Sequence, residues 1–285
     1  PFSLKKQIIK YGAPGTGKTF QARQQTSLLF DIWKEEFAPN ADFTHQGQIE
    51  LVQFHPSFSY EDFIEGLRPI LDKNDQAQLT LQNGVFKEFC LSAGKWEIDV
   101  FNLHLEKEWD EIKIIDLLPY KDQLSSPHWD YIFEIENQNK LISHAIPPFF
   151  FIIDEINRAE LSRVFGELMY CLEYRGVKGC VKTQYANLNT NKTGMLPSEQ
   201  GYQFFIPTNI YLIGTMNTID RSVESFDFAL RRRFSWQEVS PDISLLKYYL
   251  SEHCAKWIEL AISLEKLNEE IEKQALLGHE YQIGH

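Results

Sequence analysis

Residues 12–19 read GAPGTGKT, which fits the pattern G-x-x-x-x-G-K-[ST] at every position. The apolar run QIIKY at 7–11 precedes it and predicts a short strand, and a helical run to about Trp33 follows it. A glycine-rich turn can match the pattern by chance, but a strand before it and a helix after it argue against chance. The stretch therefore predicts a phosphate-binding loop in an α/β fold.

The loop offers groups suited to a nucleotide. Its glycines let backbone N–H groups turn inward around phosphate oxygens, and the following helix presents its positive end to the same anion. We expect Lys18 to reach the β- and γ-phosphates, as a binding and a catalytic residue, and the Thr19 hydroxyl to complete a Mg²⁺ shell. The predicted nucleotide-binding residues are Gly12, Ala13, Pro14, Gly15, Thr16, Gly17, Lys18, Thr19 and Phe20.

A second stretch, FFFIIDE at 149–155, ends an apolar strand in two adjacent carboxylates. Alone, it could be a solvated strand end. Opposite a complete phosphate-binding loop, we expect Asp154 to hold Mg²⁺ and Glu155 to orient and deprotonate the attacking water. A carboxylate directly after the metal-binding one indicates hydrolysis with an internal base, rather than phosphoryl transfer to another substrate.

A third apolar strand, NIYLIGTMN at 209–217, ends in Asn217. This side chain could hold the water or the γ-phosphate from the far side of the nucleotide, which makes it a candidate catalytic residue. The alternative is an asparagine that caps a turn before Asp220.

Three adjacent arginines, Arg231, Arg232 and Arg233, follow Asp227 on a predicted short helix. They could form a solvated basic face, a DNA contact or arginine fingers. A guanidinium stabilises the charge that spreads over the γ-phosphate in the transition state. If such a finger acts in trans, the enzyme is an oligomer with sites between neighbouring subunits.

The alternation of apolar strands with helices predicts a parallel α/β sheet sandwiched by helices. Ligands of such sheets bind at the carboxyl ends of the strands, where the loop and both carboxylates are expected. Residues 98–146 lack a clear period and are expected to be an insertion of mixed structure. The remaining expected elements are a strand at 49–55, a short strand or a hairpin around Asn83-Gly84 followed by a helix to 97, one helix from about Ala159 to Tyr174, a polar hairpin over 175–207, a short helix over 225–234 and helices over 243–273.

Bulk composition limits the function classes. The 285 residues are 43% hydrophobic, which is enough for a sizeable core and argues against disorder. The net charge of −12 argues against a surface that grips DNA phosphates throughout, so any DNA contact is expected to be local or made by other segments.

The cysteines and apolar runs bear on the compartment. We expect Cys90, Cys171, Cys180 and Cys254 to be reduced and at least partly buried, because none forms a C-x-x-C pair. The scattered histidines suggest no metal cluster. No apolar run approaches the ~20 residues that cross a bilayer, so we expect no membrane contact and a cytoplasmic protein. The first and last residues, Pro1 and His285, suggest a piece of a longer protein.

Together the motifs resemble those of AAA+ ATPases, and within them the McrB family, the motor subunits of type IV, modification-dependent restriction systems. The resemblance runs from residue 10 to 285, apart from about 98–146 and 180–203. The matching stretches include VQFHPSFSYEDFIEGLRP and the terminal YQIGH, and the most selective are DEINRAELSRVFGEL and GTMNTIDRS together with ALRRRF.

The resemblance implies a P-loop α/β domain over residues 1–239 and the start of a small helical domain over 240–285. It implies a ring, with a hexamer as the expected form, a preference for GTP over ATP with Mg²⁺, a McrC-like nuclease subunit as partner, and DNA bound through the assembly or an upstream reader domain. By the family pattern, Asn217 is sensor 1 and Arg232 and Arg233 are the trans-acting finger candidates. Asp227 and Arg231 would position their helix.

Three functions stay open at this point. The first is a GTP-hydrolysing motor that drives DNA translocation for a partner endonuclease. The second is an ATP-dependent AAA+ protein-remodelling enzyme of chaperone type, which shares the engine but acts on proteins. The third is a nucleotide-sensing scaffold without turnover, and Glu155 argues against it because a pure sensor needs no base.

Overall fold

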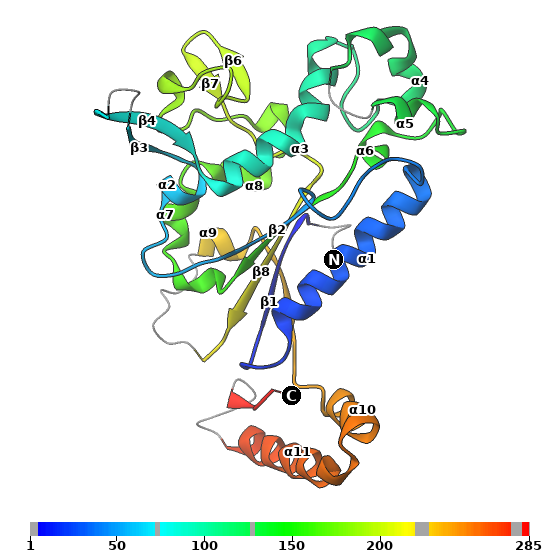
Figure 1. Ribbon diagram of the computed structural model, residues 1–285, viewed down its shortest axis with the longest axis vertical. Helices are drawn as coiled ribbons and strands as arrows, with labels where there is room; N and C mark the ends of the chain where they lie inside the picture. The colour runs from blue at the N-terminus through cyan, green and yellow to red at the C-terminus, as the bar shows by residue number, and fades with distance from the viewer. Residues whose placement is uncertain (1–4, 72–74, 126–128, 220–227, 275–280, 285) are drawn as a thin grey trace.

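The structure is a computed structural model that describes residues 5–71, 75–125, 129–219, 228–274 and 281–284. At its centre lies a five-stranded sheet with the order β2-β5-β8-β1-β9 (Figure 1). All four neighbouring pairs are parallel, which confirms the predicted sheet class. The strands are β1 (Gln7–Gly12), β2 (Ile49–Gln53), β5 (Phe149–Asp154), β8 (Ile210–Asn217) and β9 (Ser235–Glu238).

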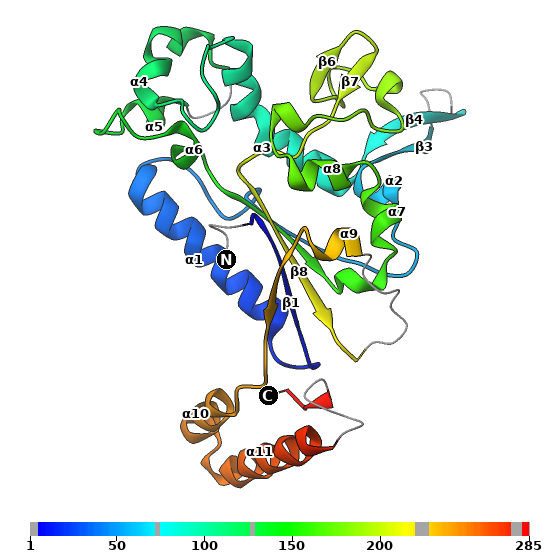
Figure 2. The ribbon, with the colours of Figure 1, turned by 180° about the vertical axis from the view of Figure 1, so that it is seen from behind.

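Helix α1 (Lys18–Phe37) covers one face of the sheet, as Figures 1 and 2 show from opposite sides. Side chains alternate between the two faces along a strand. Ile152 of β5 and Ile213 of β8 accordingly pack with Ala22 of α1, and all three are almost fully buried. This contact fixes the start of α1 beneath the carboxyl ends of the central strands.

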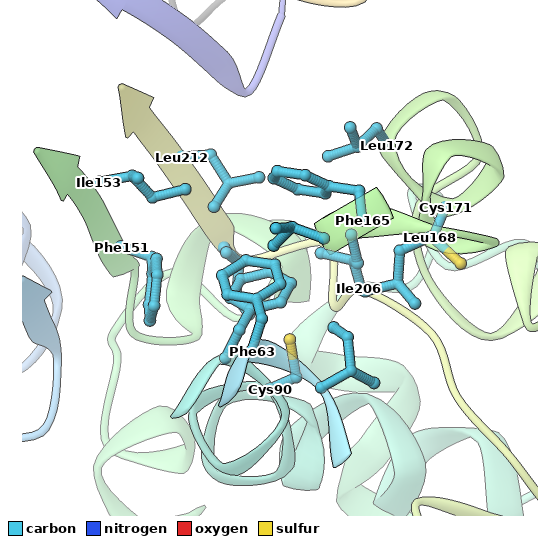
Figure 3. Close-up of a cluster of buried hydrophobic side chains, with 14 of the residues drawn as sticks. Phe63, Cys90, Phe151, Ile153, Phe165, Leu168, Cys171, Leu172, Ile206 and Leu212 are labelled. Carbon is cyan, nitrogen blue, oxygen red and sulfur yellow. The ribbon is translucent and has the colours of Figure 1, made fainter. Parts of the chain in front are cut away.

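The opposite face carries the main core, which Figure 3 shows in close-up. Phe151 and Ile153 of β5 point to this side, where Phe63 stacks on Phe86 at 4.6 Å between ring centroids. The ring of Phe165 lies 5.0 Å from that of Phe63. The α-helices that contribute to this core are α2 (Tyr60–Phe63), α3 (Val85–Asn102), α7 (Leu161–Phe165), α8 (Leu168–Glu173) and, through Leu230, α9 (Phe228–Arg231).

The described part of residues 103–146 is built mainly from short helices. They are α4 (Ile114–Leu117), the 3-10 helix η1 (Leu118–Gln123), α5 (Trp129–Phe133) and α6 (Ile142–Ala145). Trp129 and Ile142 pack with Trp33 of α1 and Trp96 of α3 in a second core. The indole N–H of Trp33 also donates to the carbonyl of His144 at 3.3 Å. The expected insertion thus extends the fold beyond the ends of α1 and α3, and α3 itself runs past residue 98.

Two hairpins lie beside the main core. β3 (Glu65–Leu71) pairs antiparallel with β4 (Ala77–Asn83), and β6 (Leu196–Ser198) with β7 (Gly201–Gln203). Of the two alternatives at Asn83-Gly84, the structure has the strand and not the hairpin turn, because β4 ends at Asn83 and Gly84 is the N-cap of α3. A Cβ at Gly84 would lie 2.4 Å from the carbonyl carbon of Phe63, so close packing rather than a turn requires glycine there.

The predicted single helix over 159–174 is also wrong. Two helices, α7 and α8, are separated by Gly166, whose φ of +48° lies in the left-handed region. The apolar spacing misled the prediction because both short helices bury their apolar side in the same core. The other 3-10 helices are η2 (Ile156–Arg158), η3 (Val177–Gly179), η4 (Ala186–Leu188) and η5 (Ala255–Trp257).

The last helices, α10 (Ile243–His253) and α11 (Ile258–Lys273), lie beyond the carboxyl ends of the strands, after α9 (Phe228–Arg231) and β9 (Figure 1). The described residues 281–284 return from this pair to the phosphate-binding loop. Buried Asn268 of α11 exchanges two hydrogen bonds with the backbone of Ile283, at 2.8 and 2.9 Å. Gly284 N–H then donates to the carbonyl of Pro14 at 3.2 Å.

The four cysteines are free thiols. Cys90 and Cys171 are buried and Cys180 is partly buried, but Cys254 is exposed, so the prediction of burial fails for it. Residue 254 falls at the end of α10, which buries none of its side chains. In the part of the chain that the structure describes, no helix is both long and apolar enough to cross a membrane.

Candidate functional site

Residues 12–17, the predicted phosphate-binding loop, lie at the carboxyl end of β1. Gly12, Gly15 and Gly17 have φ values of +151°, +75° and +70°, which glycine adopts without steric cost. A Cβ at Gly12 would lie 2.4 Å from the carbonyl oxygen of Val239, so that position also excludes a side chain. Helix α1 begins directly after Gly17 without a side-chain cap, which leaves its first N–H groups to an anion.

The Lys18 ammonium lies inside this loop. Its Nζ donates to the carbonyls of Ala13 at 2.6 Å and Gly12 at 3.1 Å, and contacts Thr16 Oγ1 at 3.3 Å. Burial lowers the pKa of Lys18, while the nearby carboxylates of Glu155 and Asp154 act in the opposite direction. A buried cation held among backbone dipoles is a suitable contact for a phosphate oxygen.

Thr19 and Asp154, the predicted Mg²⁺ ligands, are hydrogen bonded to each other. The Thr19 hydroxyl donates to Asp154 Oδ1 at 2.5 Å, and the Thr215 hydroxyl donates to the same oxygen at 2.5 Å. These are oxygen ligands, the kind that Mg²⁺ prefers. No group of three His, Cys, Asp or Glu side chains suited to a metal ion occurs among the described residues. The donors therefore fit a Mg²⁺ ion that takes its other ligands from phosphate and water.

Glu155 lies beside them with its carboxylate aimed at the last residue of β8. Asn217 Nδ2 donates to Glu155 Oε1 at 2.7 Å, and Arg158 Nε lies 3.6 Å from Oε2. The backbone of Glu155 has a φ of +52°, a left-handed conformation that costs a non-glycine residue about 1–2 kcal/mol. Such strain concentrates at functional sites. Here it turns the chain sharply after β5 and presents the carboxylate next to Asp154.

Asn217 and Asn157 link the end of β8 to the acid-bearing end of β5. The Asn217 side chain binds Glu155, and its own carbonyl accepts from Asn157 Nδ2 at 3.2 Å. The amide of Asn217 therefore faces the other predicted catalytic residue. The alternative role of Asn217 was to cap a turn before Asp220, and Asp220 lies outside the described residues, as does Asp227.

Phe20 and the arginines lie away from this constellation. Phe20 follows Thr19 in the first turn of α1 and is 68% exposed. The carbonyl of Arg233 accepts from Gln7 at the opposite, amino-terminal end of β1. The Arg233 side chain pairs with Glu173 at 3.3 Å, and the Arg231 guanidinium lies 5.4 Å from the ring centre of Trp236. The structure thus brings together Lys18, Thr19, Asp154, Glu155 and Asn217, but not the arginines.

Comparison with known proteins identifies the family. Residues 121–234 match the AAA domain of the dynein-related subfamily. The chain is 34% identical over 291 residues to the type IV methyl-directed restriction enzyme EcoKMcrB subunit of Escherichia coli (strain K12), covering 99% of this chain and 47% of that protein. The chain belongs to the McrB family of AAA+ NTPases.

Two further similarities were found for this McrB-family chain. It is 24% identical over 243 residues to the type II restriction enzyme BsuMI component YdiS of Bacillus subtilis (strain 168), covering 82% of this chain and 57% of that protein. The chain thus spans about half the length of the curated relatives it matches. A crystal structure of an ATPase candidate from Cytophaga hutchinsonii overlaps 94% of this chain and 58% of that chain, with 12% identity and a TM-score of 0.38, too low to support an argument about the fold.

Three residues of this McrB-family site escaped the sequence analysis. Thr215 bonds Asp154, Asn157 bonds the Asn217 carbonyl, and Arg158 pairs with Glu155. The signal for Thr215 was its position two residues before Asn217, which places both on the same face at the end of β8. Asn157 and Arg158 follow the paired acids closely in the sequence, which predicts that they lie near the site. The sequence does not predict which groups they bond.

Proposed function

We propose that this chain is the nucleotide-hydrolysing motor module of a McrBC-like, modification-dependent restriction system. It binds GTP in preference to ATP together with Mg²⁺, hydrolyses it in an oligomeric ring, expected to be a hexamer, and drives DNA translocation for a McrC-like nuclease subunit. The observation that carries the proposal is the convergence of Lys18, Thr19, Asp154, Glu155 and Asn217 at one end of the sheet.

Each of these side chains has a role that its surroundings support. Lys18 and the loop N–H groups would hold the β- and γ-phosphates. Thr19 and Asp154 would hold Mg²⁺, which neutralises charge on the phosphate oxygens. Glu155 would take the proton of the attacking water, and the Asn217 amide would hold the carboxylate in the orientation that accepts it.

The position of the arginines supports an oligomer. The six residues of β1 separate Gln7, which touches Arg233, from Gly12 of the loop, a span of about 16 Å at the usual strand rise. An arginine side chain is shorter than that, so neither Arg232 nor Arg233 reaches the nucleotide of its own subunit. In a ring, the same arginines can reach the γ-phosphate held by a neighbour.

The two finger candidates differ in their surroundings. The Arg233 side chain is 14% exposed and paired with Glu173. Arg232 is exposed, and its guanidinium makes no hydrogen bond or ion pair with the described residues. We therefore assign Arg232 as the finger that contacts the neighbour's nucleotide, with Arg233 anchoring the segment from which it extends.

The nucleotide, DNA and nuclease parts of the proposal rest on family membership. The E. coli relative is described as a subunit of a methyl-directed restriction enzyme, and the B. subtilis relative as a component of a restriction enzyme. By the resemblance, the McrB family prefers GTP. Within the chain, the strongly acidic balance of −12 fits a motor whose DNA contacts are confined to local surfaces or partner segments.

The test is to titrate the purified chain with GTP, ATP and a non-hydrolysable analogue of each, with and without Mg²⁺, and to follow phosphate release. We expect tight binding of GTP, Mg²⁺-dependent hydrolysis, and weaker binding of ATP. Binding of ATP without measurable binding of GTP would overturn the GTP assignment and favour the protein-remodelling alternative. Hydrolysis that stays first order in subunit concentration over a wide dilution range would overturn the trans-acting arginine.

A further inference from the structure

Gln7, the first residue of β1, is a buried polar residue that has no role in the proposed nucleotide site. It is 5% exposed, and its amide joins three segments that are distant in the sequence. Its Nε2 donates to the carbonyl of Leu172 in α8 at 3.0 Å and to the carbonyl of Arg233 at 2.8 Å. Its Oε1 accepts from Arg175 Nη2 at 2.8 Å. All the hydrogen-bonding groups of this amide are engaged at the arginine-bearing end of the sheet.

Arg175 determines which way this amide faces. A guanidinium can only donate hydrogen bonds, and a backbone carbonyl can only accept them. With Arg175 on one side and two carbonyls on the other, the Gln7 oxygen must face Arg175 and its nitrogen must face Leu172 and Arg233. The Nε and Nη1 atoms of Arg175 are buried and have no hydrogen-bond partner among the described residues, so the guanidinium is held in the interior rather than drawn out into solvent.

Further contacts hold the same arginine segment. The Lys5 ammonium donates to the carbonyl of Arg232. Together with the Gln7 amide on the Arg233 carbonyl and the Arg233–Glu173 ion pair, it ties down the backbone of two consecutive residues. No hydrogen bond or ion pair with the described residues holds the guanidinium of Arg232. A fixed backbone that carries a guanidinium without a partner in this part of the chain is the arrangement expected of a side chain that acts on a group outside its own subunit.

The surface next to this network suits an anion. Five cationic residues, Lys5, Lys6, Arg175, Arg232 and Arg233, line one cavity, and Glu173 is its only acidic lining residue among those described. In a protein with a net charge of −12, this local excess of positive charge favours the approach of a phosphate-bearing partner.

We infer that Gln7, oriented by Arg175, is a positioning residue that fixes the Arg232–Arg233 segment so that Arg232 meets the nucleotide bound by the neighbouring subunit. The inference rests on the proposed function, because it takes Arg232 to act in trans. It adds a role for two residues, at 7 and 175, that belong to no nucleotide-binding motif.

The variants follow from the geometry. Gln7→Leu removes both donors and the acceptor at similar volume, while Gln7→Glu keeps an acceptor for Arg175 and removes the donors to Leu172 and Arg233. Gln138→Leu is the matched control, because Gln138 Nε2 also donates to two backbone carbonyls, those of Phe133 and Ile135, in the helical segment far from the arginines in the fold. Gln7→Glu provides the test if Gln7→Leu does not fold.

The expected result is a separation of binding from turnover. Displacing a catalytic group by about 1 Å can cost ~100-fold in rate, so we expect both Gln7 variants to lose about 10- to 100-fold in kcat. Nucleotide affinity should stay at the wild-type value, because Lys18 and the loop lie at the other end of β1. Gln138→Leu should keep the wild-type kcat. A Gln7 variant that folds and has the kcat of the Gln138→Leu control would overturn the inference.

Mixed assemblies separate a positioning role from a general structural one. Glu155→Gln subunits have no base but carry a correctly placed arginine segment. Gln7→Leu subunits keep the base, but their arginine segment is displaced. If Gln7 acts through Arg232, a mixture of the two hydrolyses nucleotide faster than either does alone. An Arg232→Ala plus Glu155→Gln mixture is run in parallel. Recovery there without recovery for Gln7→Leu refutes the positioning role, whereas no recovery with Arg232→Ala refutes the trans-acting finger of the proposed function.

Discussion

Replacing Glu155 by glutamine tests the proposed chemistry with little change to the structure. The glutamine side chain has nearly the same shape, and its Oε1 can still accept from Asn217 Nδ2, the 2.7 Å bond that holds the carboxylate. What disappears is the negative charge and the ability to take a proton from water. The substitution therefore removes the base while leaving its surroundings in place.

The structure lets the effects on stability and on rate be compared. The lost ion pair joins Glu155 to Arg158 over 3.6 Å, and the Arg158 side chain is 44% exposed. Pairs of this kind contribute less than about 1 kcal/mol to the free energy of unfolding. A general base contributes about 10²- to 10⁴-fold to the rate, or ~2.7 to 5.4 kcal/mol in the activation free energy. The rate effect should therefore dominate.

The assay is single-turnover hydrolysis with enzyme in excess over nucleotide, next to the affinity for a fluorescent analogue and the Tm. We expect Glu155→Gln to bind with wild-type affinity, to unfold within a few degrees of wild type and to hydrolyse at least ~100-fold more slowly. Glu160→Gln is the control, because Glu160 is an exposed carboxylate five residues further along the chain. This variant should hydrolyse the nucleotide at the wild-type rate. A Glu155→Gln rate within about tenfold of wild type, with binding intact, would show that another group is the base.

Three other substitutions test the remaining parts of the structure. Lys18→Ala should abolish nucleotide binding, measured by the same fluorescent analogue, because it removes the cation inside the loop, and retained affinity would contradict that role. Phe63→Ala should lower the free energy of unfolding by about 3–5 kcal/mol in urea denaturation, since Phe63 is fully buried, whereas Leu28→Ala, at a 59% exposed position, should cost under about 0.5 kcal/mol. Burial lowers the pKa of Lys6 from 10.5 to about 8, so the unfolded chain binds more protons than the folded chain between these values, and wild-type stability gains a contribution as the pH rises through this range. The stability of Lys6→Met relative to wild type should therefore fall from pH 8 to 10.5, and a pH-independent difference would refute the burial of a charged Lys6.

The central sheet and the grouping of most candidate site residues at one end of it could be predicted because their signals are contiguous. Lys18 and Thr19 belong to an eight-residue motif, and Asp154 and Glu155 directly follow an apolar strand. Both patterns are local, and the rule that ligands bind at the carboxyl ends of parallel strands joins them without knowledge of the pairing. The position of Asn217 depends on the order and register of the sheet, because β8 lies between β5 and β1 and brings Asn217 to Glu155.

The remaining features could not be predicted because they depend on distant parts of the chain. β9 has only four residues and no apolar run, and it forms because β1 offers it an edge. The division into α7 and α8 at Gly166 does not interrupt the helical spacing of the apolar residues, so that spacing does not reveal it. Gln7 is a single polar residue at the start of an otherwise mainly apolar strand, and its partners Leu172 and Arg233 are 165 and 226 positions away.

The contact between Gly284 and the phosphate-binding loop has a consequence for how the two ends of the chain can vary. A Cβ at Gly284 would lie 2.1 Å from the carbonyl carbon of Gly15 and 2.6 Å from the oxygen of Pro14. Residue 284 must therefore be glycine as long as this contact is kept. Any change in the path of the loop at Pro14 and Gly15 also moves the C-terminal segment. Residues separated by almost the whole length of the chain therefore restrict each other's shape. Because the Asn268 side-chain amide ties the segment to α11, a shift of that helix is transmitted through this amide and the backbone of residues 283–284 to the loop that would hold the phosphates.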